Sequence, residues 1–178
     1  MNYTTYQKTD IESIIELFHT TFANSEGEAE GKVLGAFARE MMETTPEQDL
    51  QVFVAKDGEK IVGSVMFSTL TLESDKTAKL LSPMAVSTEV QGKGIGQALI
   101  NHALSILKSQ GVDIAVTYGD PNFYSKVGFA QISEEVIKAP LPLSFPEGWL
   151  GQSLNGEGLE AISGESGCVP ALNNPELW

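Results

Sequence analysis

Gln91-Gly92-Lys93-Gly94-Ile95-Gly96 is the stretch of sequence that decides the fold. An apolar run ending in Met84-Ala85-Val86 precedes it, and an amphipathic pattern with helical spacing follows it. A strand that enters a glycine-rich turn and then a helix presents backbone N–H groups with no side chains in front of them. The aligned peptide dipoles add partial positive charge at the same end of the helix. The stretch therefore predicts a turn that binds phosphate.

Two common phosphate-binding motifs do not fit this turn. In a P-loop, Gly-Lys is followed by Ser or Thr, whereas Gly94 follows Lys93 and no glycine stands at the start of the motif. The dinucleotide motif G-x-G-x-x-G also fails, because its sixth position is Gln97 counted from Gly92 and Leu99 counted from Gly94. An unrelated nucleotide-binding protein is therefore disfavoured.

A second informative segment follows after one predicted helix and one predicted strand. It reads Gly119-Asp120-Pro121-Asn122-Phe123-Tyr124-Ser125-Lys126-Val127-Gly128-Phe129 and contains the pattern Tyr-x-x-x-Gly-Phe. Together the two segments resemble the GNAT superfamily of N-acetyltransferases, most firmly over residues 50–132. The resemblance implies an α/β fold with a mixed twisted sheet, helices on both faces, and two parallel strands splayed around an acyl-CoA cleft.

The resemblance also implies the chemistry and its residues. Acetyl-CoA would be the cosubstrate, and a primary amine of a small molecule or a protein would attack it directly in a ternary complex. Lys93 would either add a charge or stay solvated, and Asn122 would either cap the short helix or contact the pantetheine arm. The residues implied to bind the cofactor are Met84, Ala85, Val86, Gln91, Gly92, Lys93, Gly94, Ile95, Gly96, Gln97 and Asn122.

Tyr124 is the candidate catalytic residue, as the general acid. A phenol has an ordinary pKa near 10, above the value of about 8.5 for a thiol, so it stays protonated at neutral pH and can protonate a departing thiolate. The alternative is a core tyrosine with a satisfied hydroxyl group. The general base stays open, because each candidate is alternatively a solvated charge. These candidates are Glu26, Glu28, Glu30, Glu73 and Asp75.

Composition excludes several other functions. The formal charge of −13 argues against nucleic-acid binding, which needs clustered Lys and Arg. Two isolated histidines and one cysteine, Cys168, fit neither a standard zinc site nor a disulfide framework. No apolar run is long enough to span a bilayer, and the start of the chain has no signal-peptide pattern, which predicts a cytoplasmic protein without membrane contact.

At 178 residues, 42% of them hydrophobic, the chain predicts a single N-acetyltransferase domain over 1–178. Its core would cover about 1–138, with an extension over 139–178 packed on it. The resemblance allows for a homodimer, and a non-catalytic acyl-CoA sensor or partner-binding module on the same fold is the alternative function.

Periodicity predicts the order of the elements. A helix begins at Ile11 with Asp10 as its N-cap. The other predicted helices span 28–43, 94–110 and 122–127, and the predicted strands span 3–7, 51–56, 60–72, 79–86, 112–117, 129–132 and 149–154.

Overall fold

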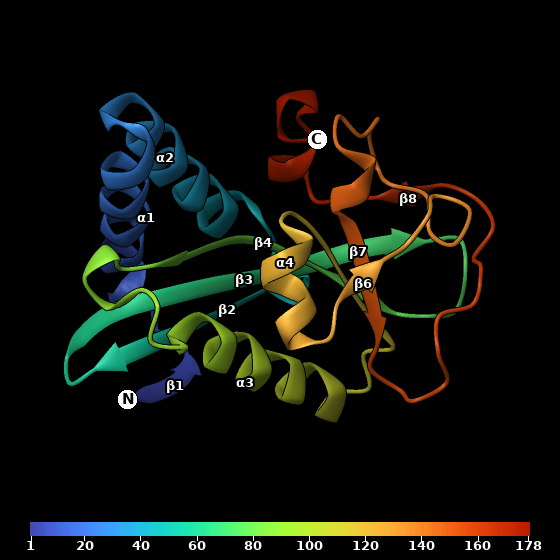
Figure 1. Cartoon of the computed structure of the whole chain (residues 1–178), viewed down its shortest axis with the longest axis horizontal. Coiled ribbons are helices and arrows are strands. Elements are labelled where there is room, and N and C mark those ends of the chain that lie inside the picture. Colours follow the sequence, from blue (N-terminus) through green and yellow to red (C-terminus); the bar gives the residue numbers. More distant parts are fainter. The chain divides into compact units, whose positions relative to one another are not determined.

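The computed structural model describes residues 1–178 and confirms the α/β class (Figure 1). All the predicted helices and strands are present, and mainly their end residues differ. The helices are α1 (Ile11–Glu26), α2 (Glu28–Thr44), α3 (Ile95–Ser109) and α4 (Pro121–Tyr124). The strands are β1 (Asn2–Thr5), β2 (Leu50–Asp57), β3 (Lys60–Leu72), β4 (Ala78–Val86), β5 (Ile114–Tyr118), β6 (Ala130–Gln131), β7 (Trp149–Ser153) and β8 (Ser166–Gly167).

The strands form one mixed sheet in the order β1-β2-β3-β4-β5-β7-β6, and β8 pairs with β3. β4 and β5 are parallel, as predicted, in a register that runs from Ala78↔Ile114 to Leu81↔Thr117. The β1–β2, β3–β8, β5–β7 and β6–β7 pairs are antiparallel. The predicted divergence of β4 and β5 beyond this register stays a prediction.

The chain forms two compact units, Met1–Met66 with Pro83–His102 and Phe67–Ser82 with Ala103–Trp178. The chain passes between them inside β3, β4 and α3 rather than through linkers. The predicted core over 1–138 and extension over 139–178 follow a different division of the chain and stay a prediction.

In the first unit, α1 and α2 pack side by side (Figure 1). Two glycines of α2 permit the close approach. A Cβ atom on Gly31 would lie 2.6 Å from the carbonyl oxygen of His19, and one on Gly35 would lie 3.2 Å from the His19 Cβ atom. Glycine costs a helix interior about 1 kcal/mol relative to alanine, so the close contact explains both positions.

The strands of the first unit are covered on both faces. Four consecutive β2 residues, 52–55, are fully buried, although successive side chains of a strand point to opposite faces. A Cβ atom on Gly63 would lie 3.4 Å from Leu99 of α3, which identifies α3 as one cover. Figure 1 shows α1 and α2 on the other side of these strands, which confirms the predicted helices on both faces.

Asp10 is the N-cap residue of α1, as predicted, but its carboxylate makes no capping hydrogen bond to that helix. It accepts instead from the Gln7 backbone N–H at 2.8 Å and from Lys56 Nζ at 3.1 Å. Lys56 lies on β2, so the carboxylate combines a local contact with one made by tertiary packing.

In the second unit, the C-terminal tail is part of the sheet and of the core. β7 pairs with β5 on one side and with β6 on the other. Trp149 is fully buried, and its Nε1 donates to the Ile137 carbonyl oxygen at 2.8 Å. The C-terminal Trp178 is also buried, and its ring stacks on Tyr118 with ring centroids 5.6 Å apart.

Asp113 ties three segments of the second unit together. Its carboxylate accepts from the Thr77 backbone N–H at 2.9 Å and from Asn155 Nδ2 at 3.1 Å. The hydrogen bond from the Thr77 backbone is the largest cause that lowers the pKa of Asp113 below its ordinary value, and the Asn155 contact adds to it.

This arrangement predicts a pH-dependent contribution to stability. Because the folded-state pKa of Asp113 is lowered, its contribution is present above the unfolded-state value of about 3.9 and is lost as pH falls through the folded-state pKa. We expect Asp113→Asn to lower Tm at pH 7, and the Tm gap to wild type to narrow below about pH 4. Thermal unfolding from pH 7 to pH 2 measures this. Asp57→Asn, at an exposed position, is the control, and a gap independent of pH would contradict the assignment.

No helix of the chain combines the length and the apolar character needed to cross a membrane. No three His, Cys, Asp or Glu side chains gather in the arrangement of a metal site.

Candidate functional site

The glycine-rich turn of the first unit adopts a backbone conformation that requires glycine. Gly92 and Gly94 each have φ of 79°, in the left-handed region. Nothing lies within 4 Å of a Cβ atom built on either residue, and both residues are exposed. The turn is therefore open to solvent at both glycines, as a ligand-binding turn has to be.

The first amides of α3 have no partner within the helix. The Ala98 N–H donates to the Gly94 carbonyl oxygen at 3.0 Å. The N–H groups of Ile95, Gly96 and Gln97 precede that bond, so they have no carbonyl four residues back in the helix to bind. They lie at the positive end of the helix dipole, which favours an anion.

Gln91 fixes the turn to the end of β4. Its Nε2 donates to the Val86 carbonyl oxygen at 2.8 Å, so the side-chain amide joins the turn to the last residue of the strand. Of the other strand residues predicted to bind the cofactor, Met84 is half-buried and Ala85 is buried. Lys93 is exposed and makes no ion pair, so its charge is free to act on a ligand.

The predicted catalytic residue, Tyr124, lies in the second unit at the end of α4. Its ring packs edge-on against Phe129, with centroids 5.8 Å apart and an interplanar angle of 78°. Its edge lies over the α-carbon of Gly119, where a Cβ atom would come within 2.8 Å of the Tyr124 Cε2 atom.

The surroundings of Tyr124 keep its hydroxyl group protonated. Burial is the main cause that raises the pKa of Tyr124 to about 12. The Thr117 side chain acts in the opposite direction, and the charge of Asp120 raises the pKa further. A phenol in this environment keeps its proton throughout the neutral range, so it is present as a hydrogen-bond donor for a departing thiolate.

Asn122 does not cap the short helix, so that expectation is wrong. Asp120 is the N-cap residue, and its Oδ1 accepts from the Asn122 backbone N–H at 2.9 Å. The Asn122 side chain is exposed at the second position of α4. Its predicted contact with the pantetheine arm stays a prediction.

The Gly-Phe pair of the second motif has a structural purpose. Gly128 has φ of 92° and ends the 3-10 helix Ser125–Val127. This reversal returns the chain, so that the Phe129 N–H donates to the Tyr124 carbonyl oxygen at 3.2 Å. Phe129 is 2% exposed and therefore a rigid wall for the Tyr124 ring.

Sequence reasoning missed the contact between Gly119 and the Tyr124 ring. The only signal of Gly119 was its position after the strand that leads into the Tyr-x-x-x-Gly-Phe segment. It does not stand out locally, because glycine is common in loops.

Two of the five candidate bases are engaged in contacts of their own. Glu28 Oε1 lies 2.7 Å from His19 Nε2, and Glu73 accepts from the Glu165 backbone N–H. Cys168 is half-buried, and burial raises the pKa of its thiol, so it lacks the thiolate character of a nucleophile.

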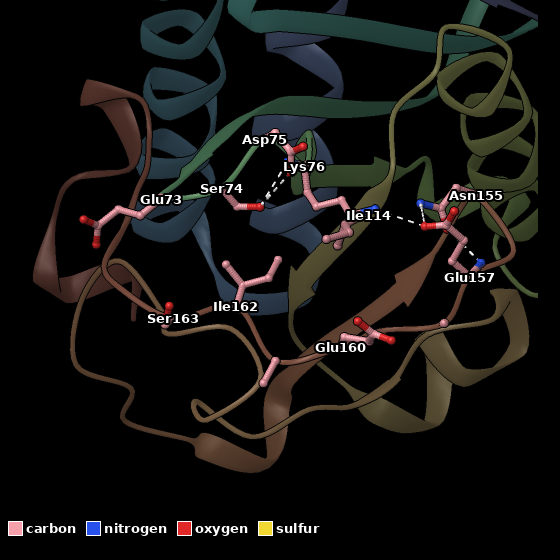
Figure 2. A pocket seen from close by; sticks show the side chains of 12 residues that line it. Glu73, Ser74, Asp75, Lys76, Ile114, Asn155, Glu157, Glu160, Ile162 and Ser163 are labelled. Atoms are coloured by element: carbon pink, nitrogen blue, oxygen red, sulfur yellow. Dashed lines mark hydrogen bonds and ion pairs between the residues drawn. The ribbon is translucent and has the colours of Figure 1, made fainter.

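The second unit also contains a cavity of about 660 Å³ that includes neither Tyr124 nor any predicted cofactor-binding residue, although two candidate bases, Glu73 and Asp75, line it. Figure 2 shows Lys76 and Ile114 on one side of it and Glu160 and Ile162 on the other. Its only lysine is paired with Glu157 at 3.0 Å. The cavity is therefore acidic, and its lining is Glu73, Ser74, Asp75, Lys76, Ile114, Asn155, Glu157, Gly158, Glu160, Ala161, Ile162 and Ser163.

Comparison with known proteins finds a matching family model and similar sequences. Residues 48–131 match the model of the acetyltransferase (GNAT) domain. The chain is 30% identical over 91 residues to the uncharacterized N-acetyltransferase YhbS of Escherichia coli strain K12. The aligned residues cover 50% of this chain and 54% of YhbS. It is 29% identical over 118 residues to YjhQ of the same strain, covering 62% and 64%. In sequence, the chain thus spans less than two thirds of these relatives.

Solved structures share the fold over nearly the whole chain. The crystal structure of Escherichia coli YhbS in complex with CoA superposes with a TM-score of 0.79 at 23% identity, covering 97% of this chain and 92% of YhbS. A GNAT family acetyltransferase from Brucella melitensis, in complex with acetyl-CoA, gives 0.73 at 19% identity, covering 97% of both chains. At these identities the likeness concerns the fold alone.

Proposed function

Because residues 48–131 match the model of the acetyltransferase (GNAT) domain, we propose that the chain transfers the acetyl group of acetyl-CoA to a primary amine. The observation that carries the proposal is the open turn, after which the amides of Ile95, Gly96 and Gln97 have no partner within the helix. A row of amides at a helix start suits a pyrophosphate. The complexes of the two structurally similar proteins with CoA and acetyl-CoA support the same cosubstrate.

In the proposed reaction, the amine nitrogen attacks the carbonyl carbon of the thioester directly, within a ternary complex. The ammonium form of the amine first loses a proton, to water or to a carboxylate of the chain. As the C–S bond breaks, Tyr124 Oη gives its proton to the departing sulfur. Free CoA and the acetylated amine leave, and water returns a proton to Tyr124. The raised pKa of Tyr124 supports this role, since the group is protonated when the step begins.

The charge of the chain supports a cationic acceptor. At a formal net charge of −13, the protein attracts an ammonium ion and raises its local concentration. The same proposal treats residues 1–178 as one N-acetyltransferase domain, with a core over about 1–138 and an extension over 139–178.

Calorimetric titration of the protein with acetyl-CoA tests the proposal at its first step. We expect saturable binding that CoA competes away and that ATP and NAD do not. No heat of binding at millimolar acetyl-CoA would overturn the proposal, and competition by ATP or NAD would point to a different nucleotide site.

A second assay separates the enzyme from a non-catalytic acyl-CoA sensor. Release of free CoA thiol is followed with acetyl-CoA and a panel of amines that includes spermidine, tyramine and a lysine-containing peptide. We expect thiol release above the amine-free rate for at least one amine. Saturable binding without amine-dependent release from a broad panel would favour the sensor.

A further inference from the structure

Gln152 is a polar residue on a strand that has neighbours on both sides. It lies on β7, opposite Ala115 of β5, and it is half-buried. An amide group taken away from water costs free energy unless it is hydrogen-bonded. The partner of the Gln152 side chain therefore shows what this residue contributes.

The partner of Gln152 is the backbone at the end of the 3-10 helix Ser125–Val127. Its Nε2 donates to the Val127 carbonyl oxygen at 2.9 Å, between residues that are 25 positions apart in the sequence. Val127 is 5% exposed, so little water reaches it to replace a lost donor. Gln152 thus fixes this piece of backbone to the sheet.

The same amide group lies against the glycine that follows Val127. A Cβ atom built on Gly128 would lie 2.9 Å from Oε1 and 3.3 Å from Nε2 of Gln152. The amide therefore rests on the α-carbon at which the backbone has its positive φ. Gln152 contacts both Val127 and Gly128, the two residues through which the chain reverses.

This reversal decides what lies beside the Tyr124 ring. It brings the Phe129 N–H to 3.2 Å from the Tyr124 carbonyl oxygen and leaves the two ring centroids 5.8 Å apart. The same part of the tail holds the other end of the segment. The Gly119 N–H donates at 3.0 Å to the carbonyl oxygen of Gly148, the residue before β7. Residues 119–129 are therefore anchored to the tail at both ends.

We propose that Gln152 is a positioning residue, which holds the Val127–Gly128 turn and through it the place of the Tyr124 ring. The proposal rests on the acetyltransferase function proposed above. Gln152 acts through the backbone of the turn and through Phe129, not by contact with the reacting atoms. A displaced ring would present its hydroxyl group to the sulfur at the wrong distance, and a misplacement of about 1 Å can cost on the order of 100-fold in rate.

The first test needs no activity. A carbon-13 label in the tyrosine rings gives NMR signals for the four tyrosines, and the signal missing from Tyr124→Phe belongs to Tyr124. Its chemical shift depends on neighbouring aromatic rings, so it reports a movement of the ring relative to Phe129. We expect the signal to move in Gln152→Met, which keeps the volume, and in Gln152→Glu, which keeps the shape, because both lose the donor. An unmoved signal in both variants would overturn the proposal.

Ser153→Ala is the matched control. Ser153 is the next residue of β7 and points to the other face of the sheet. Its Oγ donates to Asn155 Oδ1 at 2.8 Å, so this variant also loses one side-chain hydrogen bond of the same strand. We expect the Tyr124 signal to stay in its wild-type position. A signal that moves as far in Ser153→Ala would indicate a general disturbance of β7 and contradict the role of Gln152.

The second test is kinetic. We expect Gln152→Met to lower kcat about tenfold, with the KM for acetyl-CoA unchanged. In a Tyr124→Phe background, the same substitution should have no further effect on kcat, because the hydroxyl group that it positions is gone. An additive loss in the double variant, or a moved NMR signal with a wild-type kcat in Gln152→Met, would overturn the proposal.

The two tests separate this proposal from the function on which it rests. Thiol release by the wild-type protein, with a moved signal and a lowered kcat in Gln152→Met, supports both. If the wild-type protein releases no thiol with any amine, the proposed function fails, and the NMR signal still decides whether Gln152 holds the ring.

Discussion

Gly94→Asp is expected to raise the KM for acetyl-CoA on the order of 100-fold, with the fold intact. The substitution places a carboxylate beside the amides of Ile95 and Gly96, where we propose that the pyrophosphate binds. Two unit charges 4 Å apart repel by about 1 kcal/mol in water and by about 4 kcal/mol near a protein surface. Since every 1.4 kcal/mol is a tenfold change in affinity, an effect of this size follows from charge alone.

Backbone strain contributes a smaller part of the effect. Gly94 has φ of 79°, and a residue with a side chain in that region costs roughly 1–2 kcal/mol. Two controls separate strain from charge. Gly94→Ala adds strain without charge, and Gly58→Asp adds both at the β2–β3 turn, where φ is 62° and a Cβ atom meets nothing within 4 Å. An unchanged KM in Gly94→Asp, or an equal rise in Gly58→Asp, would count against the turn as the pyrophosphate site.

Tyr124→Phe is expected to lower kcat by roughly 100-fold, while acetyl-CoA binds as in wild type. Phenylalanine keeps the ring in its place between Gly119 and Phe129 but removes the proton that we propose is given to the sulfur. A positioned general acid contributes on the order of 10²–10⁴-fold to the rate, and the loss lies at the lower end because water can protonate a thiolate. Steady-state kinetics with the best amine of the panel measure the effect.

Tyr6→Phe is the control, because Tyr6 lies outside the elements that carry the proposed site.

The raised pKa of Tyr124 also predicts how kcat depends on pH. Because this pKa is raised to about 12, the acid form persists through the alkaline range used for assays. We therefore expect kcat to show no alkaline decline attributable to Tyr124 below about pH 10. A wild-type rate in Tyr124→Phe would reduce the residue to a packing role.

The elements that the sequence predicted well are those whose signals are local. Gly92 and Gly94 are required by the backbone of the turn, and the helix that follows shows its apolar spacing within a single segment. Gly128 and Phe129 also follow from local geometry, since a left-handed glycine returns the chain against Tyr124. Each of these patterns depends on residues a few positions apart, which a single sequence displays directly.

Two capping predictions differ from the structure, each for its own reason. Asp10 is the N-cap residue of α1, but its carboxylate accepts from the Gln7 backbone and from Lys56 on β2 and not from the helix. Asn122 was expected as a cap, but the carboxylate of Asp120, two residues earlier, caps α4. The first outcome depends in part on a residue distant in the sequence, and the second on a choice between two neighbouring residues.

The sequence by itself determined the order of strands and helices and the glycine conformation of the turn before α3, because propensity, glycine conformation and periodicity act over short stretches of chain. The tertiary structure alone decided that β7 enters the sheet between β5 and β6, and that the Tyr124 ring lies against Gly119. These contacts depend on how strands pair and which side chains then meet, and any glycine of the chain looks the same until that pairing is known.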